Sequence, residues 1–274
     1  MPKQDSLQWL RVPAGWRHHE SASGHCARCR VNHRLPAGAA VTAADQLLGS
    51  MLRAGRVDFQ RALRDADPSL TLERLFPGDR AHTFGVLEAV NTGGEVCLLY
   101  AYSSLPGGIR EIEGWVPPTL GAGEFDRWVK PRELEIKAMS EALAALPSGT
   151  PEWCALRAAR RETSRRLWRD LLDRYRLPSI GGLWRPMVEV SLNGDQLPSG
   201  TGECCAPKLL TEAARRGLRP RSIAEFSWGL RETSSSSWSR GILTSSCNAR
   251  CGLILGFMLC PESEPSMLSP HPIH

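Results

Sequence analysis

The chain has 274 residues, of which 42% are hydrophobic and 23% are charged. This is the composition of an ordinary globular protein, and it excludes a wholly disordered chain. The formal net charge of +5 fits an acidic or nucleic-acid partner without requiring one. Only four of the 34 basic residues are lysines. Arginine suits bidentate contacts to phosphate, although a GC-rich genome would give the same bias.

The sequence predicts no membrane span, because no apolar run reaches the roughly 18 residues that a membrane helix needs. The N-terminus lacks a secretory hydrophobic region, so we expect a cytoplasmic protein. The Arg-rich, acid-poor stretch before Ala43 leaves an organelle transit peptide as an alternative. The nine cysteines lack the even spacing of a secreted disulfide scaffold, which favours reduced thiols with one metal cluster.

The first half of the chain predicts a helix and a β-hairpin after an irregular start. Prolines and glycines interrupt every periodic run in residues 1–42. Residues 43–54 have helical periodicity. Residues 83–90 and 95–103 are β-prone and are joined by Asn91-Thr92-Gly93-Gly94, a typical hairpin turn.

The middle third predicts an antiparallel helical hairpin at about residues 131–176. Pro147-Ser148-Gly149 breaks the helical periodicity, and Thr150 is expected to cap the second helix with Pro151 in its first turn. A helix at 206–216 and a strand at 223–228 follow; residues 251–260 indicate a buried strand or core segment. Because strands and helices do not alternate, we expect an α+β fold with one domain over residues 43–260 and a frayed tail at 261–274.

The second predicted helix of the hairpin is rich in arginine, which suggests a face that follows an RNA phosphate backbone. The alternative is a solvated helix face with some i,i+4 ion pairs. The predicted RNA contacts are Arg157, Arg160, Arg161, Arg165, Arg169 and, in a later helix, Lys208.

Two groups of cysteines could bind a metal. Cys26 and Cys29 form a Cys-x-x-Cys, which His25 or His33 could complete. The second group is Cys204-Cys205 with Cys247 and Cys251. Neighbouring side chains diverge, so three thiolates (Cys204, Cys247 and Cys251) with one further ligand would hold a structural zinc. The alternative for these cysteines is a small, buried apolar side chain.

An enzyme centred on Cys204 or Cys205 is the main alternative function. A thiol just before a helix could have a lowered pKa and act as a nucleophile or a zinc ligand. The chain has no Gly-x-Ser-x-Gly, no Walker loop and no His-Glu-x-x-His. We therefore assign no catalytic residue and expect no required cofactor.

One segment of the chain is long and unusual: Gly200-Thr201-Gly202-Glu203-Cys204-Cys205-Ala206-Pro207-Lys208-Leu209-Leu210. It is the most specific part of a longer stretch that resembles the region ahead of the catalytic domain in one subgroup of RluA-type RNA pseudouridine synthases. The hairpin from His82, Trp115-Val116-Pro117-Pro118, the helical hairpin and the segment around Cys247 and Cys251 agree in order. The resemblance covers about residues 80–260; Ser227 departs from it by replacing an aromatic residue.

This resemblance implies an accessory, RNA-binding role in uridine isomerisation. The family's His-Arg-Leu-Asp motif, which carries the nucleophilic Asp, is absent from the 274 residues. We therefore expect a module that is inactive alone, whose partners are tRNA or rRNA and a separate or downstream catalytic domain, with no membrane. A degraded, non-functional fragment is a further alternative.

Overall fold

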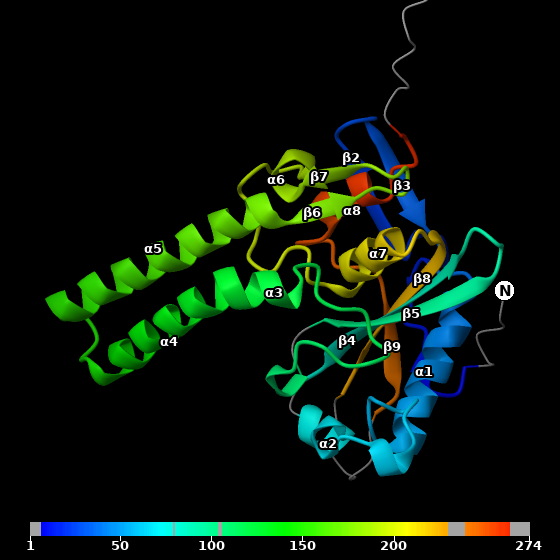
Figure 1. Ribbon diagram of the computed structural model, residues 1–274, viewed down its shortest axis with the longest axis horizontal. Coiled ribbons are helices and arrows are strands. Elements are labelled where there is room, and N and C mark those ends of the chain that lie inside the picture. The colour runs from blue at the N-terminus through cyan, green and yellow to red at the C-terminus, as the bar shows by residue number, and fades with distance from the viewer. Residues whose placement is uncertain (1–6, 79, 104–105, 230–238, 264–274) are drawn as a thin grey trace, which may run out of the picture.

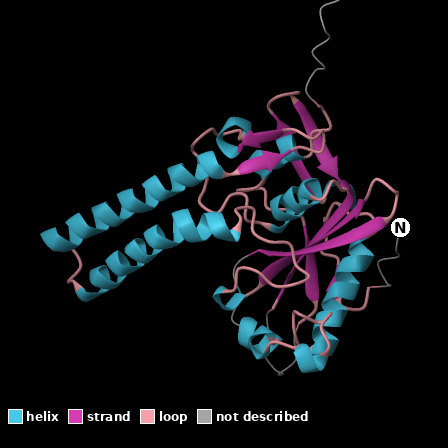
Figure 2. Ribbon diagram, in the orientation of Figure 1, coloured by secondary structure: helices cyan, strands magenta, loops and turns pink. Residues whose placement is uncertain are grey.

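The computed structural model describes residues 7–78, 80–103, 106–229 and 239–263. Its centre is a five-stranded sheet in the order β1-β9-β8-β4-β5 (Figure 2). The strands are β1 (Leu10–Arg11), β4 (His82–Val90), β5 (Val96–Ser103), β8 (Arg219–Trp228) and β9 (Gly241–Thr244). The β1–β9 pair is parallel, and the other pairs are antiparallel.

The β4–β5 hairpin forms where the sequence predicts it. Its turn closes through Asn91, whose side-chain Oδ1 accepts a hydrogen bond from the Glu95 backbone N–H at 2.9 Å. Gly94 has a φ of +83°, which a glycine adopts at no steric cost. The chain therefore reverses within five residues, and Val90 pairs with Val96.

Helices cover both faces of the sheet. Side chains alternate between the two faces along each strand, so one strand contributes to two cores. Phe84 and Val86 of β4 face one core with helix α1 (Ala40–Ala54). Leu87 and Ala89 face the other core, with α7 (Cys205–Arg215) and α8 (Gly252–Met258). A short helix, α2 (Leu72–Leu75), lies beside the first core.

Two long helices form an arm that projects from this body (Figure 1). They are α4 (Lys130–Ala145) and α5 (Pro151–Arg174), preceded by α3 (Ala122–Glu124) and a π-helical turn at Phe125–Val129. Thr150 caps α5 as predicted, with its Oγ1 accepting from the Trp153 N–H at 3.2 Å. No residue of α4 is buried. The arm joins the core near its base, where Leu167 and Leu172 of α5 are buried, and α4 stays at the surface along its length.

A second hairpin corrects the expectation of an irregular segment at residues 1–42. Strands β2 (Ala22–Cys26) and β3 (Val31–Leu35) pair antiparallel. Their residues include glycine, serine and histidine and few β-branched side chains, so no β-prone pattern marks them. Their packing against α8 stabilises them instead.

Between α5 and α7 the chain forms three short elements that contact α5, α7 and α8. They are β6 (Arg176–Pro178), β7 (Trp184–Pro186), which pairs with β6, and α6 (Met187–Val190).

The α+β class is confirmed. The predicted strand or core segment at 251–260 is mainly a buried helix, α8. The run of four serines at 234–237, whose composition predicts a loop, lies outside the described residues, as does most of the predicted tail. Among the described residues, no helix is both long and apolar enough to cross a bilayer.

Candidate metal centre and nucleic-acid interface

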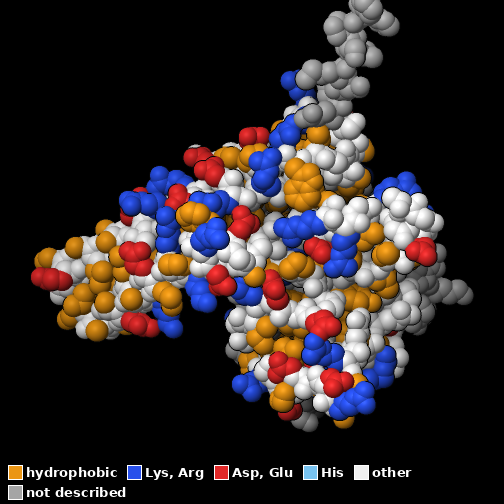
Figure 3. All heavy atoms as spheres, viewed as in Figure 1, with side chains coloured by type: hydrophobic (Ala, Val, Ile, Leu, Met, Phe, Trp, Pro, Cys, Tyr) orange, Lys and Arg blue, Asp and Glu red, His pale blue; other side chains and the backbone are white. Residues whose placement is uncertain are grey.

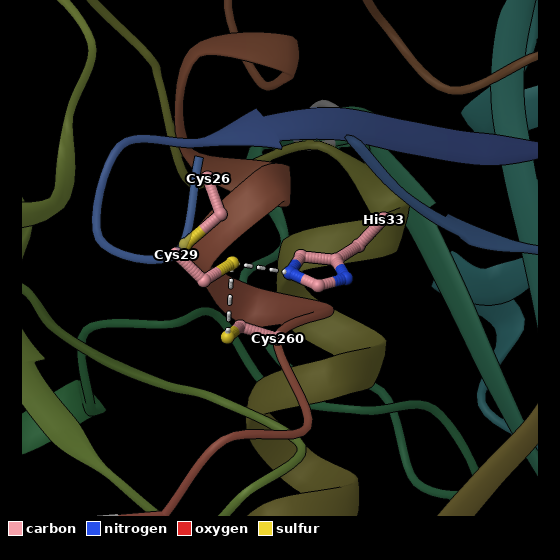
Figure 4. A group of neighbouring side chains, drawn as sticks. All are labelled: Cys26, Cys29, His33 and Cys260. Atoms are coloured by element: carbon pink, nitrogen blue, oxygen red, sulfur yellow. Dashed lines mark hydrogen bonds between the residues drawn. The ribbon is translucent and has the colours of Figure 1, made fainter. Parts of the chain in front are cut away.

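Three cysteines and one histidine converge at the β2–β3 hairpin (Figure 4). Each offers one ligand atom, and these atoms all lie within 4.8 Å of one another. The Cys29 Sγ is 3.0 Å from the His33 Nε2 and 3.8 Å from the Cys260 Sγ. The set is Cys26, Cys29, His33 and Cys260. This cluster of soft sulfur and imidazole donors could hold a metal ion.

Strand alternation decides which histidine joins the cluster. Cys26 ends β2, and His33 lies opposite Gly24, so these positions share one face of the hairpin. His25 pairs with Asn32 on the other face, and its Nδ1 is 3.1 Å from the Asn32 Oδ1. Of the two histidines left open by the sequence, the structure therefore brings His33 to the thiols.

The segment that follows α8 completes the cluster, because it carries Cys260. Cys26 and Cys260 are buried, at 1% and 0% exposure. Burial, with the Cys29 and Cys26 thiols adding to it, raises the pKa of Cys260 to about 11. The Arg28 guanidinium donates to the Ser263 carbonyl at 2.9 Å, which ties the hairpin turn to the residues after Cys260.

In the second cysteine group, the Cys204 thiol interacts with the thiols of Cys251 and Cys247. Among the described residues, it is the first group whose ligand atoms all lie within 4.8 Å of one another. The Cys251 thiol, followed by burial, raises the pKa of Cys204 far above its ordinary value. The predicted metal site at these three cysteines stays a prediction.

Cys204 and Cys205 do not have the surroundings of a nucleophile. Burial, followed by the charge of Glu225, raises the pKa of Cys205 well above its ordinary value. The Cys205 thiol donates to the Thr83 carbonyl at 3.4 Å. A reactive cysteine needs a lowered pKa and access to solvent. Desolvation and neighbouring thiols thus outweigh the helix N-terminus on which the enzyme alternative depends.

The arginines of α5 form a row on the exposed side of the arm. Arg157, Arg161, Arg165 and Arg169 follow one another at intervals of four residues, so they lie along one helix face. All four are exposed. Figure 3 shows basic side chains gathered along the part of the arm nearer the body, with a few acidic ones among them.

Two predicted RNA contacts lie away from this row. Arg160 is half-buried, and its Nε donates to the Ser140 Oγ of α4 at 2.7 Å, so it joins the two helices of the arm. Lys208 is only 3% exposed, and its Nζ donates to the Tyr102 carbonyl at 2.8 Å. The sequence alone does not show that the Lys208 side chain is buried. In the structure, Lys208 lies on the side of α7 that faces the sheet.

Lys208 instead lines a cavity of 420 Å³ at the base of the arm. Arg110, Glu133 and Glu203 also line it, so cationic and anionic side chains are present in equal numbers. The Tyr175 hydroxyl donates to the Glu203 Oε1 at 2.6 Å. This balance of charge does not favour a polyanion.

No family model, curated protein or solved structure matches the chain.

Proposed function

We propose that this protein binds structured RNA through the arginine row of α5, and that it acts as an accessory module for an RNA pseudouridine synthase. The observation that carries the RNA proposal is the row itself. Within the described part of the chain, Arg161 and Arg165 form no ion pair. Arg169 pairs with Glu162 at 2.9 Å, and the Arg157 guanidinium lies 5.0 Å from the centre of the Trp153 ring.

A row of like charges is costly to the protein without a partner. Like charges at i,i+4 each destabilise a helix by about 0.2–0.5 kcal/mol. At a rise of about 1.5 Å per residue, the four arginines extend over about 18 Å. Phosphates along a nucleic-acid backbone would neutralise such a row and release their counterions.

The assignment to pseudouridine synthesis rests on the sequence resemblance over residues 80–260. Its most specific part includes Cys204 to Leu210, which spans the start of α7, and the resembling helical hairpin corresponds to the arm. The raised pKa of Cys204 and of Cys205 favours this role over a thiol-dependent enzyme. We also propose a cytoplasmic location, which suits nine free thiols.

A zinc ion at Cys204, Cys247 and Cys251 would be structural in this proposal. The three thiols would supply three of the four ligands of a tetrahedral site. Glu225 lies close to Cys204, but its Oε1 already accepts from the Ala206 N–H at 3.0 Å and the Ser246 hydroxyl at 2.9 Å. The Glu225 Oε1 is therefore already engaged, and the three thiols are the ligands that this proposal assigns to the second group.

Filter binding across a salt series tests the RNA role, with a tRNA transcript and an rRNA hairpin as probes. We expect the logarithm of the binding constant to fall linearly with the logarithm of salt concentration. The double variant Arg161→Gln/Arg165→Gln should reduce this slope by about 2, since each phosphate contact contributes about 1. Binding that ignores salt, or no binding, contradicts the proposal.

Matched variants test whether RNA binding depends on the arginine row or only on the overall positive charge of the protein. Arg53→Gln/Arg64→Gln removes the same charge from exposed positions outside the arm and should leave the slope unchanged. Lys208→Met should also leave it unchanged, because the ammonium is buried. Equal losses in the row variant and the control variant would show that the arm has no special role.

The accessory role has its own test. The purified chain is added to an RluA-type catalytic domain, and pseudouridine formation in the bound RNA is measured. We expect the chain alone to form no pseudouridine and to accelerate formation by the catalytic domain. RNA binding without acceleration would leave the RNA role in place and reject the accessory role.

A further inference from the structure

We propose that Cys26, Cys29, His33 and Cys260 bind one Zn²⁺ ion as a closed structural site that fastens the β2–β3 hairpin to the segment after α8. This site is separate from the arginine row and does not depend on the RNA role. It also differs from the group at Cys204, Cys247 and Cys251.

The spacing of the sulfur atoms matches a tetrahedral zinc site. Zinc binds thiolate sulfur at about 2.3 Å, so two sulfurs of one tetrahedron are about 3.8 Å apart. The Cys29 and Cys260 sulfurs are 3.8 Å apart. The His33 Nε2 is 3.0 Å from the Cys29 Sγ, and it points toward the thiols rather than into solvent (Figure 4). All four donor atoms can therefore reach one ion with small adjustments.

The donor set selects zinc and a structural role. Three thiolates and one imidazole favour zinc over the oxygen-seeking magnesium and calcium ions. Four protein ligands fill the tetrahedron and leave no position for water or substrate. Two of the ligands, Cys26 and Cys260, are almost completely buried. A catalytic metal would need an open position, which this set does not offer.

The surrounding backbone is arranged to bring the ligands together. The turn between Cys26 and Cys29 is closed by the Arg30 N–H, which donates to the Cys26 carbonyl at 2.8 Å, and Arg30 adopts a φ of +60°. Gly24 of β2 meets Gly256 of α8 backbone to backbone. Cys260 is held in turn by its carbonyl, which accepts from the Gly181 N–H at 3.0 Å.

The ligands are far apart in the chain, so the ion would serve as a cross-link. Cys26, Cys29 and His33 lie before the segment that carries the family resemblance, and Cys260 lies at its end. Binding would connect the β2–β3 hairpin, near the start of the described chain, with the segment after α8, near its end. Metal binding to a site absent from the unfolded chain stabilises the folded chain.

Metal analysis of the full chain tests the site. The protein is purified with zinc present, dialysed, and measured by mass spectrometry of its metal content. We expect this site to hold one zinc ion, so that Cys26→Ser and His33→Ala each contain one equivalent of zinc fewer than the unmutated chain. His25→Ala, which alters the neighbouring histidine on the other face of the hairpin, should keep the ion. Cys204→Ser should also keep it.

Cobalt substitution of the unmutated chain avoids variants that fail to fold. Co²⁺ should give the intense visible absorption of tetrahedral thiolate coordination, and one equivalent of Zn²⁺ should remove it. A chain that binds neither metal overturns the proposal, as does a disulfide that joins these cysteines in protein kept under reducing agent. Retention of zinc in Cys26→Ser with its loss in Cys204→Ser would move the site to the second cysteine group and also overturn it.

Discussion

Gly24 and Gly256 place strand β2 directly on helix α8. A Cβ on Gly24 would overlap the backbone nitrogen of Gly256, and a Cβ on Gly256 would overlap the carbonyl of His25. The neighbours are backbone atoms, which cannot rotate away as a flexible side chain can. This contact therefore fixes the distance between Cys26, two residues after Gly24, and Cys260, four residues after Gly256.

Gly256→Ala should destabilise the protein and weaken its metal binding. Forcing a methyl group into a well-packed site costs about 1–3 kcal/mol. The free energy of unfolding by urea and the zinc content both measure the effect. Gly252→Ala is the control, because a Cβ there meets its nearest atom, the Asn248 Oδ1, at 3.6 Å, an ordinary contact. If the two variants behave alike, the close contact does not hold the hairpin.

Removing charge from the arginine row should stabilise the arm while it weakens RNA binding. Arg161→Gln/Arg165→Gln eliminates three like-charged i,i+4 pairs in the row, so we expect a gain of about 1 kcal/mol in unfolding free energy at low salt. At about 1 M salt the gain should disappear, since charges are then screened over about 3 Å. Urea unfolding at both salt concentrations measures it. A loss of stability would mean that these arginines serve the fold.

Glu225 should make stability depend on pH. Burial raises the pKa of this carboxyl from 4.5 to about 7. The folded protein then retains a proton that the unfolded chain has released, so stability falls as pH rises from about 4.5 to about 7 and is constant above. The shift corresponds to at most about 3 kcal/mol.

The variant Glu225→Gln isolates this effect, because its amide oxygen can still accept from the Ala206 N–H. Urea unfolding at about pH 5 and pH 8 should show a larger loss of stability with pH in the unmutated protein than in the variant. Parallel pH profiles would show that the Glu225 carboxyl titrates normally in the fold.

Alkylation of the native protein should separate the cysteines by their surroundings. Cys154 is exposed on α5 and should react first with iodoacetamide. Cys205 is fully buried and its pKa is raised, so it should stay unmodified until the protein unfolds. Peptide mass spectrometry over time measures both. Rapid modification of Cys204 or Cys205 at neutral pH would revive the thiol-enzyme alternative.

The sequence alone determined the elements whose signals are local. The turn at Asn91 to Gly94, the cap at Thr150 and the helix from about residue 206 were all predictable, because turn chemistry, capping and helical periodicity involve residues a few positions apart. The arginine row was visible for the same reason.

Only the tertiary structure decided the positions that depend on distant segments. In the structure, Cys260 lies beside the Cys-x-x-Cys turn, and Lys208 is buried against Tyr102. His33, and not His25, joins the thiol cluster. The β2–β3 hairpin has too little β propensity to be predicted and exists because α8 packs on it. The contacts of Lys208 with Tyr102 and of Cys260 with Cys29 join residues more than 100 positions apart, so no local pattern in the chain encodes them.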